Sequence, residues 1–315
     1  MKVHYLHYPH LTMDEAFGPS VVAIGNFDGV HCGHRRVIET AKRLAGERGL
    51  DDLVFTFVEH PRTVLRPDAP VPLLTPWAEK VERLAETGVG ATIAAHFTAD
   101  LAQLSPEAFV ERILLGQLNA KAVVTGFNFR FGHRQAGSPE LLKELGEKHG
   151  FHVEIVTPIE EDGGVVSSSR LRELVATGAI ESANEMLCYP YTLTGTVIHG
   201  DKRGRTIGFP TANLEVNREK LLPAYGVYAC RVTVGGEELP GIVNIGQRPT
   251  FDPPKLMIEA HIFDWSGDIY GETIAVSLVS RIRAEQAFPS VDALIAQIKA
   301  DCRVAREALG VAVPG

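Results

Sequence analysis

His31 and His34 are the residues whose type and spacing most clearly suggest chemistry. They end the motif Gly25-Asn26-Phe27-Asp28-Gly29-Val30-His31-Cys32-Gly33-His34, which follows an apolar run at Val21–Ile24. That run is typical of a buried strand, and the residues after the motif have the spacing of a helix. A helix beginning there would point backbone and imidazole N–H groups at a bound anion. The motif therefore predicts a site for nucleotide phosphate, with the turn formed by Gly25, Phe27, Asp28 and Gly29.

Two other interpretations of this motif remain open from the residues alone. Glycine-containing turns between strands and helices are common in α/β folds, and a histidine often has only a structural role. A zinc site at His31, Cys32 and His34 is disfavoured, because structural zinc takes four ligands in separated pairs. The sequence has no second Cys/His pair with the required spacing.

Two further segments in the N-terminal half carry groups that suit phosphate. Ser167, Ser168, Arg170 and Arg172 combine hydroxyl groups, a predicted helix start and guanidinium groups. The alternative is a serine cap followed by surface arginines. The other segment, Gly126–Gly132, contains Asn128 and follows a predicted strand. Open α/β sheets bind ligands beyond the carboxyl ends of their strands, so we expect these segments to meet the histidine motif in one crevice.

A glycine-rich basic stretch, Gly195–Asn213, is the most informative part of the C-terminal half. Gly200 and Gly208 would let the backbone approach a ligand closely, and Lys202 adds positive charge. Thr211 and Asn213 offer oxygen ligands, which Mg²⁺ combines with water and phosphate. A basic hairpin beside a proline turn is the alternative interpretation.

Glu259 interrupts the apolar run Ile258-Glu259-Ala260-His261-Ile262. An unpaired carboxylate is costly to bury, so this residue needs a partner or a chemical role. Its pattern fits a general base, but by pattern alone an outward-facing residue of a strand is the more common case.

Composition narrows the class of protein. The 315 residues are more than one core usually holds, which favours two domains. With 45% hydrophobic and 22% charged residues and a net charge of -8, we expect a soluble protein without a broad nucleic-acid surface. The four cysteines form no CxxC pair, and the sequence shows neither a signal-peptide core nor a membrane-spanning segment. We therefore expect a cytoplasmic protein.

The elements expected up to Leu187 alternate between strands and helices, which predicts a parallel sheet with crossover helices. The strands are predicted at Val21–Ile24, Leu53–Phe57, Ala91–Ala95, Ala122–Thr125 and His152–Val156. The helices are predicted at Arg35–Gly49, Trp77–Thr87, Pro106–Leu115 and Pro139–His149, with another beginning near Arg170.

After Tyr189-Pro190 the pattern changes to closely spaced strands, which predicts a small antiparallel barrel. The strands are predicted at Tyr191–Val197, Gly226–Val234, Gly241–Ile245, Met257–Ile262 and Thr273–Val279. A helix at Val291–Leu309 is expected to pack against the barrel. We place the two domains at residues 1–187 and 188–315.

Together these motifs resemble the bifunctional prokaryotic riboflavin kinase/FAD synthetase family, over nearly the whole chain. The N-terminal part is similar to the HxGH nucleotidyltransferases at Gly25–Gly29, His31–His34, Phe57–Pro61, Gly126–Gly132 and Ser167–Arg172. The C-terminal part is similar to riboflavin kinases at Gly208–Asn213, Gly241–Thr250, Glu259–His261 and Asp268–Gly271. HxGH alone would indicate only the superfamily, whereas the order and spacing of all these motifs are specific.

The resemblance implies a role for each matching residue. His31 and His34 would bind the ATP phosphates and stabilise adenylyl transfer, while Asn128, Ser168 and Arg172 would help to hold nucleotide and flavin phosphates. Thr211 and Asn213 would bind Mg²⁺-ATP, and Glu259 would accept the proton of the ribityl 5′-hydroxyl group. Flavin contacts are implied for Phe57, His60, Pro61 and Arg283. Many relatives carry Asp in place of Asn128, Thr in place of Ser169, and Arg or another residue in place of Cys32.

The implied function is phosphorylation of riboflavin to FMN, followed by adenylylation of FMN to FAD. ATP and Mg²⁺ are the expected co-substrate and metal, no permanently bound cofactor is implied, and neither nucleic acid nor a membrane is expected as a partner. Two other functions remain: an adenylyltransferase for another acceptor with a non-catalytic barrel, and a flavin-binding regulator. The oligomeric state is not determined by the sequence.

Overall fold

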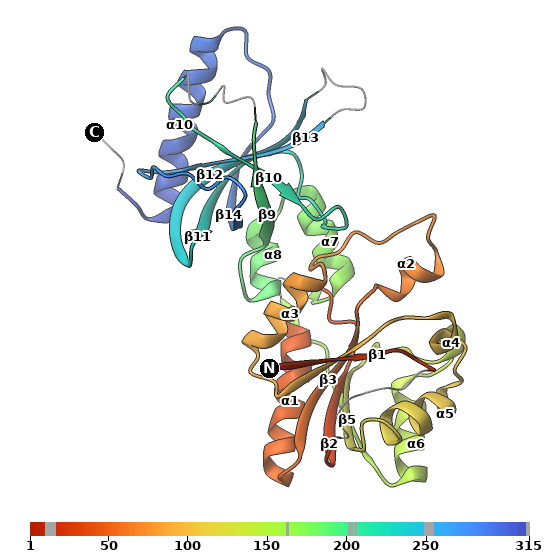
Figure 1. Cartoon of the computed structure of the whole chain (residues 1–315). Coiled ribbons are helices and arrows are strands. Elements are labelled where there is room, and N and C mark those ends of the chain that lie inside the picture. Colours follow the sequence, from red (N-terminus) through yellow and green to blue (C-terminus); the bar gives the residue numbers. More distant parts are fainter. Residues whose placement is uncertain (10–16, 162–163, 201–203, 205–206, 249–254, 313–315) are drawn as a thin grey trace. The chain divides into compact units, whose positions relative to one another are not determined.

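The computed structural model describes residues 1–9, 17–161, 164–200, 204, 207–248 and 255–312. By their contacts, these residues divide into two compact units, Met1–Ser168 and Ser169–Gly315. The first unit contains a parallel sheet with helices, and the second contains a closed antiparallel barrel and a C-terminal helix (Figure 1). The predicted fold class is confirmed.

The sheet of the first unit has six strands among the described residues, in the order β1-β4-β3-β2-β5-β6. They are β1 (Lys2–Leu6), β2 (Ser20–Ile24), β3 (Asp51–Phe57), β4 (Ala91–Ala95), β5 (Ala120–Gly126) and β6 (His152–Val156). The five predicted strands are confirmed, and β1 is an additional strand paired with β4. All neighbours in the sheet are parallel, so the carboxyl ends of the strands lie along one edge.

Helices cover both faces of this sheet, as β2 shows. Val21 and Ala23 pack in the same core as α1 (Cys32–Arg48) and α3 (Trp77–Glu86). Val22 and Ile24 pack in the opposite core with α5 (Pro106–Phe109) and α6 (Pro139–His149). Figure 1 shows α1 on one side of the strands and α5 and α6 on the other. With both faces buried, the strand ends are the places where polar chemistry is accessible.

The helices begin and end at residues whose side chains suit those positions. Ser105 and Ser138 cap α5 and α6, each with a proline in the first turn, and Gly49 ends α1 with φ of 64°. A π-helical segment, Val110–Leu115, continues α5, so the two together span the helix predicted at 106–115. The smaller elements are α2 (Pro61–Leu65), α4 (Ala99–Ala102), a 3₁₀ turn at His133–Gln135, β7 (Glu160–Glu161) and β8 (Gly164–Val165).

The second unit is built on a barrel with the strand order β10-β13-β12-β11-β14-β9. The strands are β9 (Thr192–Ile198), β10 (Ala212–Val216), β11 (Gly226–Val234), β12 (Glu237–Arg248), β13 (Lys255–Ile262) and β14 (Thr273–Ala284). Helix α10 (Val291–Leu309) packs outside the barrel, where Ala305 and Leu309 share a core with Val227 and Ile242. The predicted barrel and C-terminal helix are confirmed, and β10 is a strand that the sequence pattern missed.

Helices α7 (Ser168–Thr177) and α8 (Ile180–Leu187) pack with the barrel. The Asn184 amide donates to the carbonyl of Leu278 at 2.9 Å, and Arg281 donates to the carbonyl of Thr177 at 3.3 Å. The contact division therefore falls at 168/169, and the domain boundary at 187/188 remains a prediction. Among the helices of the described residues, none is both long and apolar enough to span a membrane.

Candidate active sites

The loop between β2 and α1 has a strained backbone that a buried carboxylate holds in place. Phe27, Gly29 and Val30 adopt positive φ values of 51°, 86° and 35°, which are unfavourable for the two residues with side chains. Asp28 is 1% exposed, and its carboxylate accepts the N–H groups of Leu74 and Thr75 at 3.2 and 3.0 Å. In return, Thr75 Oγ1 accepts the N–H of Gly29 at 2.8 Å. Asp28, assigned to phosphate binding by sequence, is thus a buried anchor that shapes the loop.

His31 and His34 lie together at the start of α1. His31 is the N-cap residue, and its Nδ1 accepts the backbone N–H of His34 at 3.2 Å. The two rings stack with their centroids 3.6 Å apart, and the rings of Phe27 and His34 form a T-shaped pair with centroids 5.2 Å apart. Because Nδ1 of His31 is an acceptor, a neutral ring carries its proton on Nε2. The pair forms one rigid group of imidazoles at a helix N-terminus, as the sequence predicted.

The segment that follows β3 is fixed at several points. Val58 donates its N–H to the carbonyl of Ala95 at 3.0 Å. The Glu59 carboxylate contacts His96 Nδ1 at 2.7 Å and accepts the N–H of Phe97 at 3.1 Å. Burial acts to raise the pKa of Glu59, but these two hydrogen bonds outweigh it and hold the pKa below its usual value.

The predicted flavin residues of the first unit lie in this fixed segment. Phe57 ends β3, with its ring 5.6 Å from that of Phe55 and 5.3 Å from that of Phe97. His60 caps α2 by accepting the N–H of Arg62, and Pro61 opens that helix. The segment therefore presents an aromatic side chain beside a helix start, at the carboxyl edge of the sheet.

Lys80 is a buried residue of this site that the sequence analysis missed. It lies on α3 with 3% of its surface exposed, and its ammonium donates to the carbonyls of Asn26 at 3.2 Å and Phe57 at 3.0 Å. Burial lowers its pKa from the ordinary 10.5 to about 8, against the attraction of the Asp28 and Glu59 carboxylates. Its spacing of four from the buried Leu84 places it on the apolar face of α3, which is the signal that could have identified it.

Ser168 is brought to the histidine loop, as the sequence predicted. Its hydroxyl donates to the carbonyl of Asp28 at 2.9 Å. Asn128 is exposed and follows β5, so it lies at the same edge of the sheet as the loop after β2. Ser167 is half-buried beside Ser168, whereas Arg170 and Arg172 lie on α7 in the second unit.

In the barrel, Glu259 lies on β13 between two asparagines. The strand register places it opposite Asn213 on β10 and opposite Asn244 on β12. It lines a cavity of about 540 Å³ between the barrel wall and α10. Other lining residues are Thr211, Asn244, His261, Arg283, Leu294, Ile298 and Asp301.

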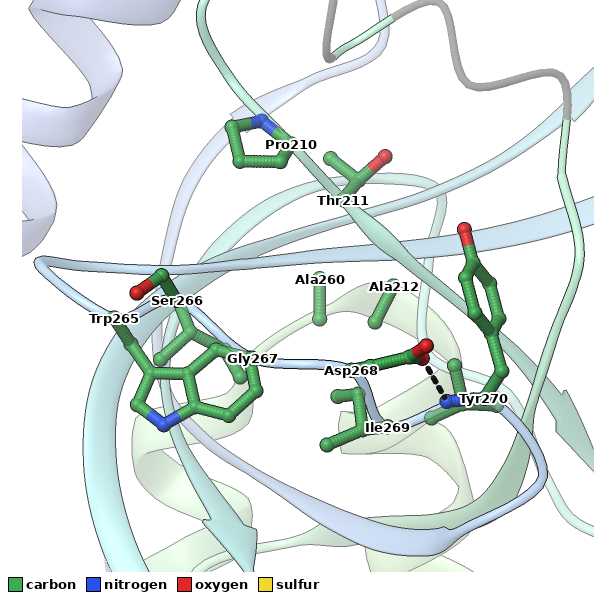
Figure 2. A pocket seen from close by; sticks show the side chains of 12 residues that line it. Pro210, Thr211, Ala212, Ala260, Trp265, Ser266, Gly267, Asp268, Ile269 and Tyr270 are labelled. Atoms are coloured by element: carbon green, nitrogen blue, oxygen red, sulfur yellow. Dashed lines mark hydrogen bonds between the residues drawn. The ribbon is translucent and has the colours of Figure 1, made fainter.

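A second cavity, of about 250 Å³, lies on the opposite side of β13. Ala260 and Ile262, which alternate with Glu259 and His261, contribute to its lining. Figure 2 shows Trp265, Asp268 and Tyr270 around it, with Pro210 and Thr211 above. Asp268 accepts the backbone N–H of Tyr270 at 3.2 Å and so closes the turn that presents both rings. Thr211 lines both cavities.

The turn that carries Thr211 is attached to β13 by His261. The carbonyl of Pro210 lies 2.7 Å from His261 Nδ1, so this nitrogen is the donor. Burial lowers the pKa of His261, although the bond to Pro210 opposes the change, and the ring is neutral near pH 7. A neutral ring with its proton on Nδ1 leaves Nε2 as an acceptor, and the His261 side chain contributes to the lining of the larger cavity.

Glycines pack closely on the predicted metal ligands. A Cβ at Gly200 would lie 2.3 Å from the side-chain nitrogen of Asn213, and one at Gly204 would lie 2.2 Å from the Phe209 carbonyl oxygen and 3.4 Å from Thr211 Oγ1. Gly208 has φ of 90°, which L residues rarely adopt. Lys202 lies outside the described residues.

Arg283 is held by a buried carboxylate from α10. Its guanidinium donates to Asp301 at 2.9 Å from Nε and contacts it at 2.8 Å from the terminal nitrogen. Asp301 is 3% exposed and also accepts the amide of Gln297 at 2.8 Å. Arg283 therefore lines the larger cavity with a fixed orientation, and its contact with flavin remains a prediction. Asn244, His261 and Asp301 were missed as site residues, because their contacts depend on strand pairing in the barrel or, for Asp301, on the packing of α10 against it.

Two family models match the sequence, one for FAD synthetase over residues 13–170 and one for riboflavin kinase over residues 187–309. A bifunctional riboflavin kinase/FMN adenylyltransferase of Listeria monocytogenes is 42% identical over 303 residues, covering 96% of each chain. The protein of the same name from Bacillus subtilis is 40% identical over 306 residues, again 96% of each chain. The chain belongs to the bifunctional riboflavin kinase/FMN adenylyltransferase family. The predicted bifunctional enzyme of FMN and FAD synthesis is thereby confirmed.

A crystal structure described as a macrolide-efflux protein from Streptococcus pneumoniae is also similar to this member of the riboflavin kinase/FMN adenylyltransferase family. The TM-score is 0.85 and the identity 36%, over 92% of this chain and 95% of that chain. The two chains are therefore similar in fold as well as in sequence over most of their length.

The buried carboxylate of Asp28 generates a prediction about stability. In Asp28→Ala the N–H groups of Leu74 and Thr75 lose their acceptor, and each unsatisfied group costs about 1–3 kcal/mol. We expect the free energy of unfolding of the first unit to fall by about 2–5 kcal/mol on this basis. Urea denaturation followed by Trp77 fluorescence in a W265F background measures it. The exposed Asp68→Ala is the control, and equal stabilities of the two variants would contradict the role of Asp28.

The lowered pKa of Lys80 generates a prediction about pH. Between pH 8 and 10.5 the unfolded chain keeps a proton that folded Lys80 has lost, so the free energy of unfolding rises with pH in this window. Relative to Lys80→Met, the wild type should gain about 3 kcal/mol in total, with no relative change below pH 8. Urea denaturation of both proteins at pH values below, within and above the window measures the difference. Parallel pH curves would show that burial does not perturb Lys80.

Proposed function

We propose that the barrel unit transfers the γ-phosphate of ATP to riboflavin, and that the first unit transfers AMP from a second ATP to the resulting FMN. The observation that carries the residue assignment is the position of Thr211 between two cavities, one of which contains Glu259. This arrangement provides separate places for a nucleotide base and a flavin, with the phosphates between them.

The cavity volumes support this assignment of ligands. About 540 Å³ is within the range of pockets that bind small ligands, and the larger cavity has both apolar residues from α10 and the carboxylate of Glu259. The smaller cavity has aromatic side chains, Trp265 and Tyr270, which suit the flat ring of a nucleobase. A phosphate chain running over Thr211 would bring the γ-phosphate to the side of β13 where Glu259 lies.

Mg²⁺ fits the oxygens of Thr211 and Asn213. Both are neutral donors, and Mg²⁺ usually completes its shell with water and with phosphate oxygens. The glycines leave the space that such a shell needs, because a Cβ at Gly200 would displace the Asn213 amide. Bound Mg²⁺ would neutralise charge that develops on the phosphates during transfer.

Glu259 is proposed as the general base of the kinase. Its carboxylate would accept the proton of the ribityl 5′-hydroxyl group as that oxygen attacks phosphorus. Asn213 and Asn244 flank it in the strand register and leave it beside polar neighbours. Arg283, fixed by Asp301, would position the flavin in the same cavity.

In the first unit, His31 and His34 are proposed to stabilise adenylyl transfer. Imidazole N–H groups at a helix N-terminus place donors where negative charge grows on the α-phosphate. Gly25, Phe27 and Gly29 shape the loop, Phe57, His60 and Pro61 would contact the flavin, and Asn128, Ser167 and Ser168 would contact phosphates. The family resemblance extends this phosphate set to Arg170 and Arg172. Since both reactions consume ATP, a cytoplasmic location fits the proposal.

The function is tested by incubating the purified chain with riboflavin, ATP and Mg²⁺ and separating the flavins by chromatography. We expect FMN to accumulate first and FAD to follow, and we expect chelation of Mg²⁺ to stop FMN formation. A folded protein that made neither flavin nucleotide would reject the proposal. If the chain formed FMN from riboflavin but formed no FAD, even when FMN was supplied, the role of the first unit would be rejected.

Glu259→Gln tests the general base, because glutamine keeps the shape of the side chain but accepts no proton. We expect kcat for FMN formation to fall by about 10²–10⁴-fold. FAD formation from supplied FMN should be unchanged, and Glu238→Gln, on the exposed surface of β12, should affect neither step. If kcat for FMN formation by Glu259→Gln stayed within about threefold of the wild type, the fall would be far smaller than a general base requires, and the carboxylate would not be the base.

His31→Asn tests the imidazole apart from the helix cap, because asparagine is also a favourable N-cap residue. We expect FAD formation from FMN to fall by about 100-fold or more. FMN formation by the barrel should stay at the wild-type rate. Wild-type FAD formation in a folded His31→Asn protein would mean that His31 only caps α1.

A further inference from the structure

Lys80 is a buried cation to which the proposed chemistry gives no role. Its side chain runs from α3 to the carboxyl edge of the sheet, and the ammonium is bonded to two backbone carbonyls. One carbonyl belongs to Asn26, in the loop that carries the histidine pair. The other belongs to Phe57, at the start of the segment proposed to contact the flavin. Asn26 follows β2 and Phe57 ends β3, which are neighbouring parallel strands.

The contacts around Lys80 come from both of these segments. The Asn26 carbonyl accepts a second hydrogen bond, from Thr56 Oγ1 at 2.9 Å, so β3 and α3 hold the same atom. The carboxylates that attract the ammonium are Asp28, from the histidine loop, and Glu59, from the segment after β3. The Lys80 ammonium therefore interacts with both segments, through hydrogen bonds to their carbonyls and through attraction to their carboxylates.

This arrangement costs stability, which argues that the cation serves a geometric purpose. An ammonium is expensive to remove from water, and two neutral carbonyls compensate only part of that expense. The downward shift of the Lys80 pKa has this same cause. A hydrophobic residue would fill the position at lower cost, but it would leave the carbonyls of Asn26 and Phe57 without the donor that they share.

We propose that Lys80 is a positioning residue for adenylyl transfer, which holds the histidine loop and the flavin segment at a fixed separation. This inference rests on the function proposed for the first unit. The FMN phosphate must approach the α-phosphate of ATP in line with the departing pyrophosphate. If each substrate is bound by one of the two segments, their separation sets the distance between the attacking oxygen and phosphorus.

A positioning role predicts a particular kinetic pattern. Each segment keeps its own substrate contacts when the link is lost, so the KM values for ATP and FMN should change little. The rate of the bound complex should fall, because a misplacement of about 1 Å costs about 10²-fold. A general loss of structure would instead weaken substrate binding and lower the amount of folded enzyme.

The test compares Lys80→Met with Lys42→Met in the full chain. Lys42 on α1 also donates its ammonium to a backbone carbonyl, that of Thr87 at the end of α3. For Lys80→Met we expect kcat for FAD formation from supplied FMN to fall by about 100-fold, with both KM values within about threefold of wild type. Lys42→Met should keep the wild-type kcat, and FMN formation should be unchanged in both variants.

Chemical rescue provides the second readout. Lys80→Ala lacks a propylammonium group, so added n-propylamine should restore part of the lost kcat, and it should have no effect on Lys42→Ala. A normal kcat in Lys80→Met would overturn the proposal, as would a loss confined to KM or a loss of kcat in Lys80→Ala that n-propylamine does not restore. A wild-type chain that made no FAD would instead reject the function proposed for the first unit.

Folding of the Lys80 variants is checked with Trp77, whose ring lies 5.7 Å from the ammonium. If Lys80→Met does not fold, Thr56→Val replaces it as the test. Valine keeps the shape of threonine and removes only the hydroxyl that shares the Asn26 carbonyl. We expect a several-fold fall in kcat with unchanged KM values, and a wild-type kcat in Thr56→Val would overturn the proposal.

Discussion

A β-strand directs successive side chains to opposite faces, and both units of this enzyme depend on that alternation. In the first unit, Val21 and Ala23 enter one core while Val22 and Ile24 enter the other, so β2 has no face left for a ligand. Polar groups are then accessible only beyond the strand end, where the histidine loop lies. In the barrel, the same alternation lets β13 line two cavities, with Glu259 and His261 in one and Ala260 and Ile262 in the other.

Buried polar groups hold the segments that the strands leave at the sheet edge. Asp28 stabilises a loop with positive φ values at Phe27 and Val30, and Lys80 joins that loop to the end of β3. When these groups are buried they lose their hydrogen bonds to water, and specific hydrogen bonds within the protein replace them. Because those bonds require fixed positions, they stabilise one geometry rather than a compact state in general. An active site that aligns two phosphorylated substrates needs such definition more than it needs additional apolar contact.

The barrel unit uses the same principle with different elements. The neutral ring of His261 holds the turn at Pro210, and the buried carboxylate of Asp301 fixes Arg283 from α10. Helix α10 thus does more than cover the apolar wall formed by Val227 and Ile242. It also supplies the charge that orients a residue of the larger cavity, which explains why the Asp301 carboxylate is buried on this helix.

Local patterns in the sequence determined the two fold classes, most strands and the histidine, threonine, asparagine and glutamate motifs, because each depends on neighbours a few residues away. The patterns missed β1, whose polar residues do not alternate clearly, and β10, which is hidden inside a glycine-rich motif. Only the tertiary structure decided that Asp28 anchors a loop, that Lys80 is buried and that Asp301 holds Arg283. These roles join residues that are 18 or more positions apart, and in the cases of Asp28 and Lys80 as many as 47 and 54 apart. Which of these residues meet depends on the orientation in which a helix packs against a sheet or barrel. That orientation is determined by the packing of the whole unit rather than by any local stretch of sequence.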